Sequence, residues 1–216
     1  FLRRVTPQLL RVRAARTPPT AAPCVLTEDC ALAATVFILC GRRLGETRYI
    51  QAAQRAVGSL TALSPGLPPS YTPVSALNAQ LTCGAGAALS LALLTLGQDE
   101  ALHPYRESGL RLLGASLHLF TTQNGMPMHT PQDAAAFFPR MPAIFDSELP
   151  SPAALMQHAL ALADSFRPEA GYRDAAHTLW AAAAPYVHQQ PLACAGLIDA
   201  ANFTLSESPE APPRPR

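Results

Sequence analysis

The stretch TEDCALAATVFILCGRRLGETRYIQAAQRAVGSL, residues 27–60, decides the fold because it holds two amphipathic helical patterns separated by a glycine. Leu32, Val36 and Leu39 recur on one helix face, and the threonine that opens the stretch is a suitable N-cap. A second apolar stripe follows Gly45 and consists of Tyr49, Ala53, Ala56, Val57 and Leu60. Two such helices joined by a tight turn predict a helical hairpin.

The helical pattern continues along the rest of the chain. A third helix is predicted from a cap at Ser75 to Gly97, and a fourth carries an apolar stripe that ends at Phe120. Residues 122–150 lack periodicity. Three more helices are predicted to begin at Ser151–Pro152, Tyr172 and Pro191.

These hairpins resemble one another with a period of about fifty residues, which is typical of a solenoid or a closed ring of paired helices. We therefore predict an all-α domain over residues 24–205, in which about three and a half tandem hairpins form half of an α/α toroid. The first, third, fifth and seventh of these helices would line the inside of the ring. Residues 1–23 are expected to form a basic helix and a proline-rich strap, and residues 206–216 a disordered proline-rich tail.

The first sixteen residues contain five arginines and no acidic residue. One interpretation is a mitochondrial targeting remnant. The other, which we prefer, is an ordinary basic helix over Leu2–Arg13 that leads into a longer fold whose earlier part is not in this chain.

Composition excludes several classes of function. The formal net charge is +1, which argues against a nucleic-acid-binding surface. All 16 basic residues are arginine, so a Schiff-base lysine and a P-loop lysine are both excluded. The longest apolar stretch, residues 85–96, is too short to cross a bilayer, and we expect no transmembrane segment.

The five cysteines form no CxxC pair and have no histidine at zinc-site spacing, so we expect neither a metal site nor a cofactor. An odd number of scattered cysteines favours a reducing compartment, such as the cytoplasm, or the mitochondrion if the basic N-terminus is a targeting remnant.

Three short motifs resemble one known family. Residues 9–18 (LLRVRAARTP) and Val25-Leu26-Thr27 resemble the basic helix, Arg-x-Pro strap and "VLT" helix start of the thioredoxin-domain-containing proteins of the spermatogenesis-associated type. Residues 44–56 resemble the next helix of that family. Arg140, followed by residues 146–151 (DSELPS), resembles its "RP…DGAxPSGNS" loop.

This resemblance implies an α/α toroid similar to those of six-hairpin glycosidases and N-acylglucosamine 2-epimerases, with a thioredoxin-like domain in front of it in full-length members. The chain would then be the second half of a toroid. Its polar motifs differ from the family pattern, because "TAWNG" is replaced by Thr27–Ala31 (TEDCA), "DDYA" by Thr82–Ala85 (TCGA) and "SGNS" by Ser151–Ala154 (SPAA). Polar positions that would line a central cavity have thus become small or apolar.

Four carboxylates are the candidate catalytic residues, since glycoside chemistry uses one carboxyl to protonate the leaving oxygen and another to attack or to activate water. They are Asp146, Glu148, Glu28 and Asp29. Candidate substrate-binding residues are Arg140, His129 and His158. The alternative explanation is structural, because acids in a first helical turn are favoured by the helix dipole and histidines on helices are often half-buried.

From the lost polar motifs we predict a non-catalytic toroid domain with a structural or protein-interaction role. Its partner would be another protein or the missing first half of the same protein, contacted through residues 122–150, which are rich in Met and Phe. The competing hypothesis is a carbohydrate isomerase, epimerase or glycoside hydrolase that uses the candidate carboxylates.

Overall fold

The computed structural model describes residues 2–18, 25–62, 70–71, 82–132 and 139–206. The α-helices of these residues are α1 (Leu2–Ala14), α2 (Thr27–Leu44), α3 (Thr47–Ala62), α4 (Cys83–Leu96), α5 (His103–Phe120), α6 (Pro152–Phe166), α7 (Tyr172–Gln189) and α8 (Ala195–Ser206). Short 3₁₀ turns precede α5, α7 and α8: η1 (Glu100–Leu102), η2 (Pro168–Ala170) and η3 (Pro191–Cys194). The all-α prediction is confirmed.

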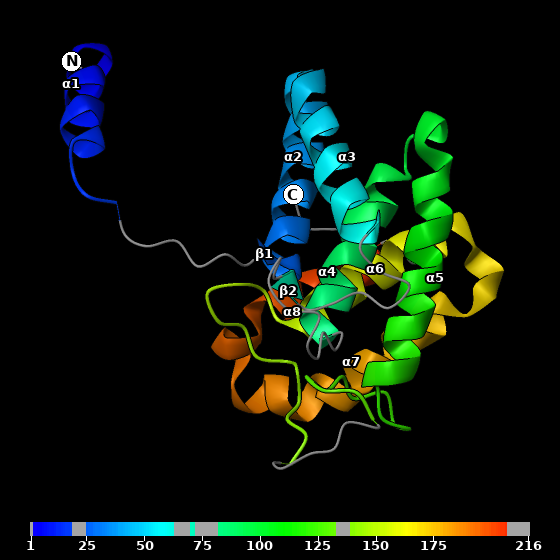
Figure 1. Cartoon of the computed structure of the whole chain (residues 1–216). Helices are drawn as coiled ribbons and strands as arrows, with labels where there is room; N and C mark the ends of the chain where they lie inside the picture. The colour runs from blue at the N-terminus through cyan, green and yellow to red at the C-terminus, as the bar shows by residue number, and fades with distance from the viewer. Residues whose placement is uncertain (1, 19–24, 63–69, 72–81, 133–138, 207–216) are drawn as a thin grey trace, which may run out of the picture.

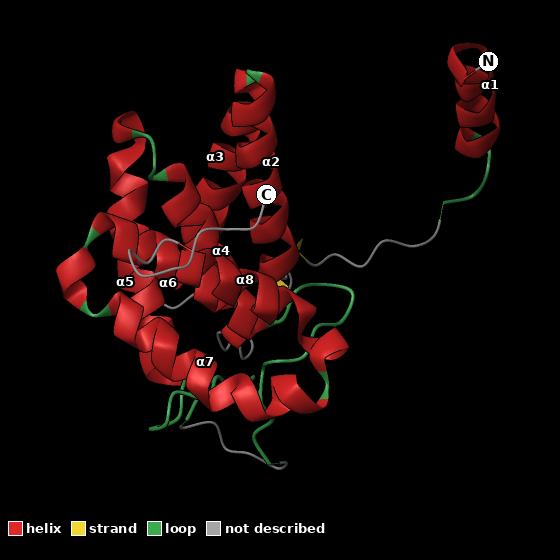
Figure 2. Ribbon diagram, turned by 180° about the vertical axis from the view of Figure 1, so that it is seen from behind, coloured by secondary structure: helices red, strands yellow, loops and turns green. Residues whose placement is uncertain are grey.

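The helices form consecutive hairpins. Helix α2 packs against α3, α4 against α5, and α6 against α7. In addition α2 packs against α4, α4 against α6, and α6 against α8, so these four helices form one continuous layer, which we call the inner row. Helices α3, α5 and α7 lie on its outer side (Figures 1 and 2). This is the predicted arrangement of three and a half hairpins of an α/α toroid.

Helix α4 is the centre of the core. All of its residues from Cys83 to Leu96 are buried, because α2, α5 and α6 cover it on three sides. A helix that is apolar all round can only be stable when it is surrounded in this way. Side chains of the helices around it, including Ile38, Leu113 and Leu160, belong to the same buried cluster.

One predicted helix start was wrong. Helix α4 begins at Cys83 and not near Ser75, because Thr82 is its N-cap: the backbone of Thr82 is extended, and its side-chain oxygen accepts a hydrogen bond from the N–H of Ala85 at 3.2 Å. Ser75 itself lies outside the described residues. Within the described part of the linker, Ser70–Tyr71 (β2) pairs antiparallel with Val25–Leu26 (β1), just before α2.

Helix α1 stands away from the other helices in both overall views (Figures 1 and 2). It ends at Ala14, one residue beyond the predicted end, and Leu9, Leu10 and Val12 are exposed on it. The described helices include none with the combined length and apolar character that a bilayer-spanning segment requires.

The segment between α5 and α6 folds largely onto the core of this chain. Met126, Ala143 and Ile144 are buried, and isolated backbone bridges pair Thr121 with Pro127 and Met128 with Pro142. Met141, with 63% of its surface exposed, is the large apolar side chain that this segment presents to solvent among its described residues. Phe137 and Phe138, which contributed to the predicted partner contact, lie outside the described residues.

Candidate functional site

A pocket of about 560 Å³ lies where the amino ends of α2, α4 and α6 meet the segment between α5 and α6. We call it the amino-end pocket. Its described lining residues are Glu28, Thr82, Gly84, His129, Thr130, Phe145, Asp146, Ser147, Leu149, Pro150, Ser151 and Pro152. It therefore brings together two of the candidate carboxylates, Glu28 and Asp146, and one candidate histidine.

The carboxyl group of Asp146 holds the amino ends of two helices together. One oxygen accepts a hydrogen bond from the N–H of Ser151, the N-cap of α6, and the other accepts from the N–H of Gly196 in the first turn of α8, both at 2.7 Å. The N–H of Asp146 donates to the carbonyl of Ala193 at 2.7 Å. A negative group at two helix amino ends satisfies donors that have no partner within the helices. Both oxygens of Asp146 are thus used in the fold.

Gly196 permits this contact. A Cβ atom at Gly196 would lie 3.0 Å from one carboxyl oxygen of Asp146 and 3.3 Å from the other, which is closer than side chains normally approach. The carboxyl group can therefore reach the backbone of α8 because residue 196 has no side chain.

Glu28 lies against α4 at the wall of the pocket. A Cβ atom at Gly84 would lie 2.1 Å from Oε2 of Glu28, so the carboxyl group occupies the space that a side chain at residue 84 would fill. Burial raises the pKa of Glu28, and the neighbouring charge of Asp29 raises it further. Within the described parts of the chain, the Glu28 carboxyl group makes no hydrogen bond or ion pair.

Cys83 lies beside Glu28 but is fully buried. Burial, together with the charge of Glu28, raises the pKa of its thiol to about 12, although Arg140 acts in the opposite direction. Its backbone N–H donates to the carbonyl of His129 at 3.3 Å. The thiol is therefore protonated at neutral pH and does not act as a nucleophile there.

His129 is exposed at the rim of the pocket, and its backbone is tied to the carbonyl of Met141. Partial desolvation lowers the pKa of its imidazole, which favours the neutral ring near neutral pH. A neutral imidazole can both donate and accept a hydrogen bond.

The other candidates lie outside the pocket. Asp29 and Glu148 are exposed and are not among its lining residues. Arg140 donates hydrogen bonds from Nε and Nη2 to the carbonyl of Thr130, at 3.1 and 2.8 Å, and so fixes the conformation of its own segment.

His158 lines a separate, apolar hollow of about 290 Å³ on the inner row, with Leu39 of α2 and Leu91 of α4. Its Nε2 is 3.9 Å from a carboxyl oxygen of Asp199. Burial lowers its pKa more than Asp199 raises it. This histidine therefore does not line the amino-end pocket with Glu28 and Asp146.

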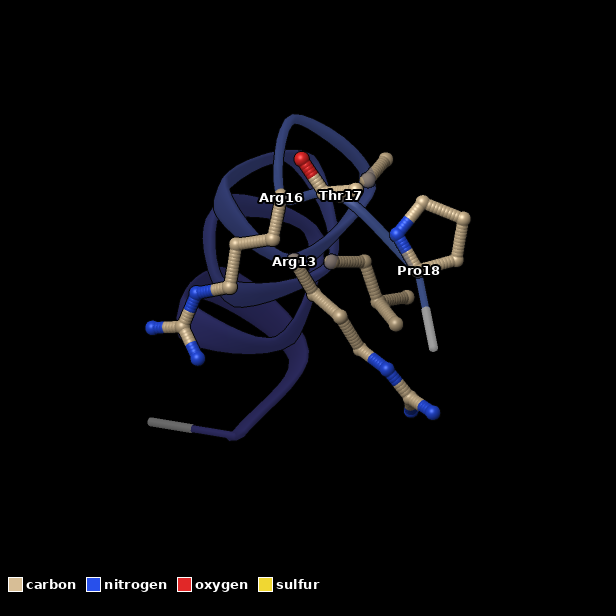
Figure 3. Close-up of a pocket in the computed structure, with 6 residues that line it drawn as sticks. Arg13, Arg16, Thr17 and Pro18 are labelled. Atoms are coloured by element: carbon tan, nitrogen blue, oxygen red, sulfur yellow. The ribbon is translucent and has the colours of Figure 1, made fainter. Parts of the chain in front are cut away.

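A further hollow, of about 670 Å³, is formed at the end of α1 by residues of one short stretch (Figure 3). Figure 3 shows the guanidinium groups of Arg13 and Arg16 pointing in different directions, away from the helix. All residues that line this hollow come from one exposed helix end, and no side chains from different parts of the chain meet there. The hollow is therefore not a candidate site. The described residues also contain no group of three or more His, Cys, Asp or Glu placed to hold a metal ion.

Sequence reasoning did not identify the roles of Gly196 and Phe145 in this site, or the contact between Glu28 and Gly84. The ring of Phe145 is held by a T-shaped contact with Tyr186 of α7, at 6.2 Å between ring centroids. A small residue in the first turn of each of two inner helices was the available signal for close approach by a carboxyl group.

Replacing Glu28 with glutamine is expected to stabilise the protein at neutral pH. A carboxyl group whose pKa is raised on folding binds more protons in the folded state, so stability is lost as pH rises from its usual pKa through the raised one. Glutamine removes this loss. Denaturation midpoints of the parent protein and of Glu28→Gln are measured at neutral pH and near pH 4. The variant should be the more stable protein at neutral pH, and the difference in stability should be smaller in acid. The exposed Glu148→Gln should show no such change, and an equal effect of the two substitutions would refute the assignment.

Comparison with known proteins supports the fold and leaves the activity open. No protein-family profile matches the chain, and no curated protein matches it in sequence. Among solved structures, a GH76 α-mannanase of Bacteroides thetaiotaomicron is similar, with a TM-score of 0.66 and 12% identity over 88% of this chain and 55% of that one. A D-mannose isomerase is similar with a TM-score of 0.53 and 16% identity, over 72% of this chain and 39% of that one.

By their names both neighbours act on carbohydrates, and the present chain spans 55% of the mannanase and 39% of the isomerase. At such low identity the similarity shows the fold alone.

Proposed function

We propose that this chain is a non-catalytic part of an α/α toroid, whose role is to pack against the helical segment that completes the ring. In the resembling family such a segment precedes the matched region, so we assign it to the first half of the toroid on the same polypeptide. The family resemblance itself rests on the sequence motifs quoted above and is part of this proposal.

The observation that carries the proposal is the exposed apolar edge of α2. Val36 and Leu44 have 55% and 65% of their surface exposed, although α2 belongs to the inner row. At the opposite end of the row, Ile198 of α8 is 37% exposed. In a closed ring every inner helix has an inner neighbour on both sides. Exposed apolar side chains at an open end of the row therefore support the proposal that another helix packs against them.

The number of helices favours one occupant over another. The described residues supply four inner helices, α2, α4, α6 and α8, and the six-hairpin ring that the family resemblance implies needs six. A second copy of the chain would bring four more and overfill such a ring. A segment with two inner and three outer helices fits the remaining space, which supports a different helical segment as the occupant.

The alternative, an enzyme with two catalytic carboxylates, has weaker support. Glu28 and Asp146 both line the amino-end pocket, but both oxygens of Asp146 accept hydrogen bonds from backbone N–H groups. Glu148 and Asp29 are exposed outside the pocket. A general acid paired with a nucleophile or base therefore lacks its second member among the candidates.

The described part of the segment between α5 and α6 is packed on this chain's own core, so we place the proposed interface on α2 and not on residues 122–150.

A photo-crosslinking amino acid at Val36 or at Leu44, introduced into the protein in its own cells, should react with a helical segment of the same polypeptide. The same group at Arg111, which is exposed on the outer helix α5, should not.

Mass spectrometry of the crosslinked peptides identifies the segment. Crosslinks to a second copy of residues 27–206, crosslinks to another protein, or equal crosslinking from Arg111 would each contradict the proposed role. Saturable turnover of an α-mannan or of D-mannose that disappears in Glu28→Gln would instead establish the enzyme.

A further inference from the structure

Helix α1 has surface chemistry that the proposed packing role does not use. It stands away from the other helices (Figures 1 and 2). Of the described side chains in residues 3–18, that of Val5 is partly covered and the others are exposed. A helix of 13 residues with a proline inside it is marginal in water unless another surface packs against it. A surface other than these helices is therefore needed to stabilise α1.

One side of α1 carries an aliphatic stripe of Val5, Leu9 and Val12, which we call the α1 stripe. Their spacing of four and three residues places them on one face of the helix. Leu9 and Val12 have 63% and 57% of their surface exposed. Leu10, with 55% exposed, lies about 100° around the helix from Leu9 and outside the stripe.

Arginines occupy much of the remaining surface of α1. Arg3, Arg4 and Arg11 lie on the other side of the helix, and Arg13 lies beside the stripe. No acidic residue accompanies them in the first sixteen residues. All 15 acidic residues of the chain belong to residues 17–216, which therefore carry a net negative charge. The positive charge of the protein is thus concentrated on the helix that carries the α1 stripe.

From this arrangement we infer that α1 binds the surface of a membrane that contains anionic lipids. The helix would lie parallel to the membrane, with the α1 stripe among the acyl chains and the arginines at the headgroup phosphates. An apolar stripe on a helix whose other faces are rich in arginine is the usual form of such a surface helix. The inference goes beyond the proposed function and does not depend on what packs against α2, since α1 alone provides the contacts.

Other anionic partners fit α1 less well. The guanidinium groups of Arg13 and Arg16 point in different directions (Figure 3), so they do not converge on a single phosphate, whereas separate headgroups can pair with each. A nucleic acid would pair with the arginines but would leave the α1 stripe in water. A specific protein interface takes about 800 Å² from each partner. Three aliphatic side chains on one 13-residue helix supply much less than that.

The test mixes the full chain with vesicles of phosphatidylcholine, either alone or with about a third of the lipid replaced by phosphatidylserine. Sedimentation measures the bound fraction at about 0.1 M salt. Binding to the anionic vesicles should be at least about tenfold tighter, because each arginine near such a surface strengthens binding by about fivefold. Raising the salt to about 0.5 M should remove most of this difference. Circular dichroism should show a gain of helix on binding.

Two neighbouring leucines test the α1 stripe. Leu9→Ala removes exposed apolar surface from the stripe and should weaken binding to the anionic vesicles by about fivefold or more. Leu10→Ala removes the same group from a similarly exposed position on another face, and should change binding by less than about twofold. Alanine preserves helix propensity in both variants, so the comparison isolates the face that enters the membrane.

Two pairs of arginines test the charge. Arg11→Gln with Arg13→Gln should weaken binding to the anionic vesicles by about tenfold or more. Arg55→Gln with Arg111→Gln removes the same charge from exposed positions on α3 and α5, and should leave binding within about twofold of the parent protein.

Four results would overturn the inference. The chain binds neither kind of vesicle; it binds both kinds equally; Leu10→Ala weakens binding as much as Leu9→Ala; or the chain binds soluble poly-L-glutamate more tightly than the anionic vesicles, which would identify an acidic protein as the partner of α1.

Discussion

Replacing Asp146 with alanine is expected to lower the free energy of unfolding by about 3–5 kcal/mol. The carboxyl group accepts one hydrogen bond from the N–H of Ser151 and one from the N–H of Gly196, both at 2.7 Å. Hydrogen bonds to charged groups are worth about 1.5–3 kcal/mol each, and their loss also leaves two donors without a partner. The amino ends of α6 and α8 would lose the group that joins them.

The size of this effect is measured by urea denaturation of the parent and variant proteins followed by circular dichroism. Asp146→Asn keeps one acceptor oxygen but turns an NH₂ group towards the second donor, so a loss of at least about 2 kcal/mol is expected. Glu148→Ala is the matched control, since Glu148 is an exposed carboxylate two residues away, and should change stability by less than about 0.5 kcal/mol. An Asp146→Ala protein as stable as this control would show that the carboxyl group does not hold the helix ends.

Most of the fold could be predicted from the sequence because local patterns determine it. Apolar spacing located the helices, and Gly45, with a φ angle of 71°, ends α2 in the left-handed conformation that glycine favours. The order of hairpins followed from short connections. The start of α4 was the exception, since Ser75 and Thr82 are both good N-caps and only tertiary packing selects between them.

The site could be predicted only in part. The sequence suggested Asp146 and Glu28 as paired carboxylates, and the structure places both at one pocket. The surroundings of these two carboxyl groups depend on parts of the chain that are distant in sequence. Asp146 accepts hydrogen bonds from the N–H groups of residues 5 and 50 positions away. Glu28 likewise lies against Gly84, which is far from it in sequence. Such pairings arise from tertiary structure and have no local signal.

Gly109 and Gly114 both lie inside α5, but only Gly109 contacts a residue distant in sequence. Replacing Gly109 with alanine is expected to destabilise the protein by about 1–3 kcal/mol. A Cβ atom there would lie 2.8 Å from Cγ and 3.0 Å from the backbone N of Leu94, which is buried in α4. A backbone atom cannot move aside alone, so α5 must shift away from the helix at the centre of the core.

Gly114→Ala provides a control in which the helix is the same and the contact is absent. Apart from the backbone of its own helix and its chain neighbours, no described atom lies within 4 Å of a Cβ at Gly114, which is exposed. Alanine gains about 0.5–1 kcal/mol over glycine in a helix interior, so Gly114→Ala should be more stable than the parent protein. Since Gly109→Ala receives the same gain in helix propensity, the difference between the two denaturation midpoints isolates the clash between α5 and α4. Equal stabilisation by both substitutions would mean that these helices are not packed as closely as the structure places them.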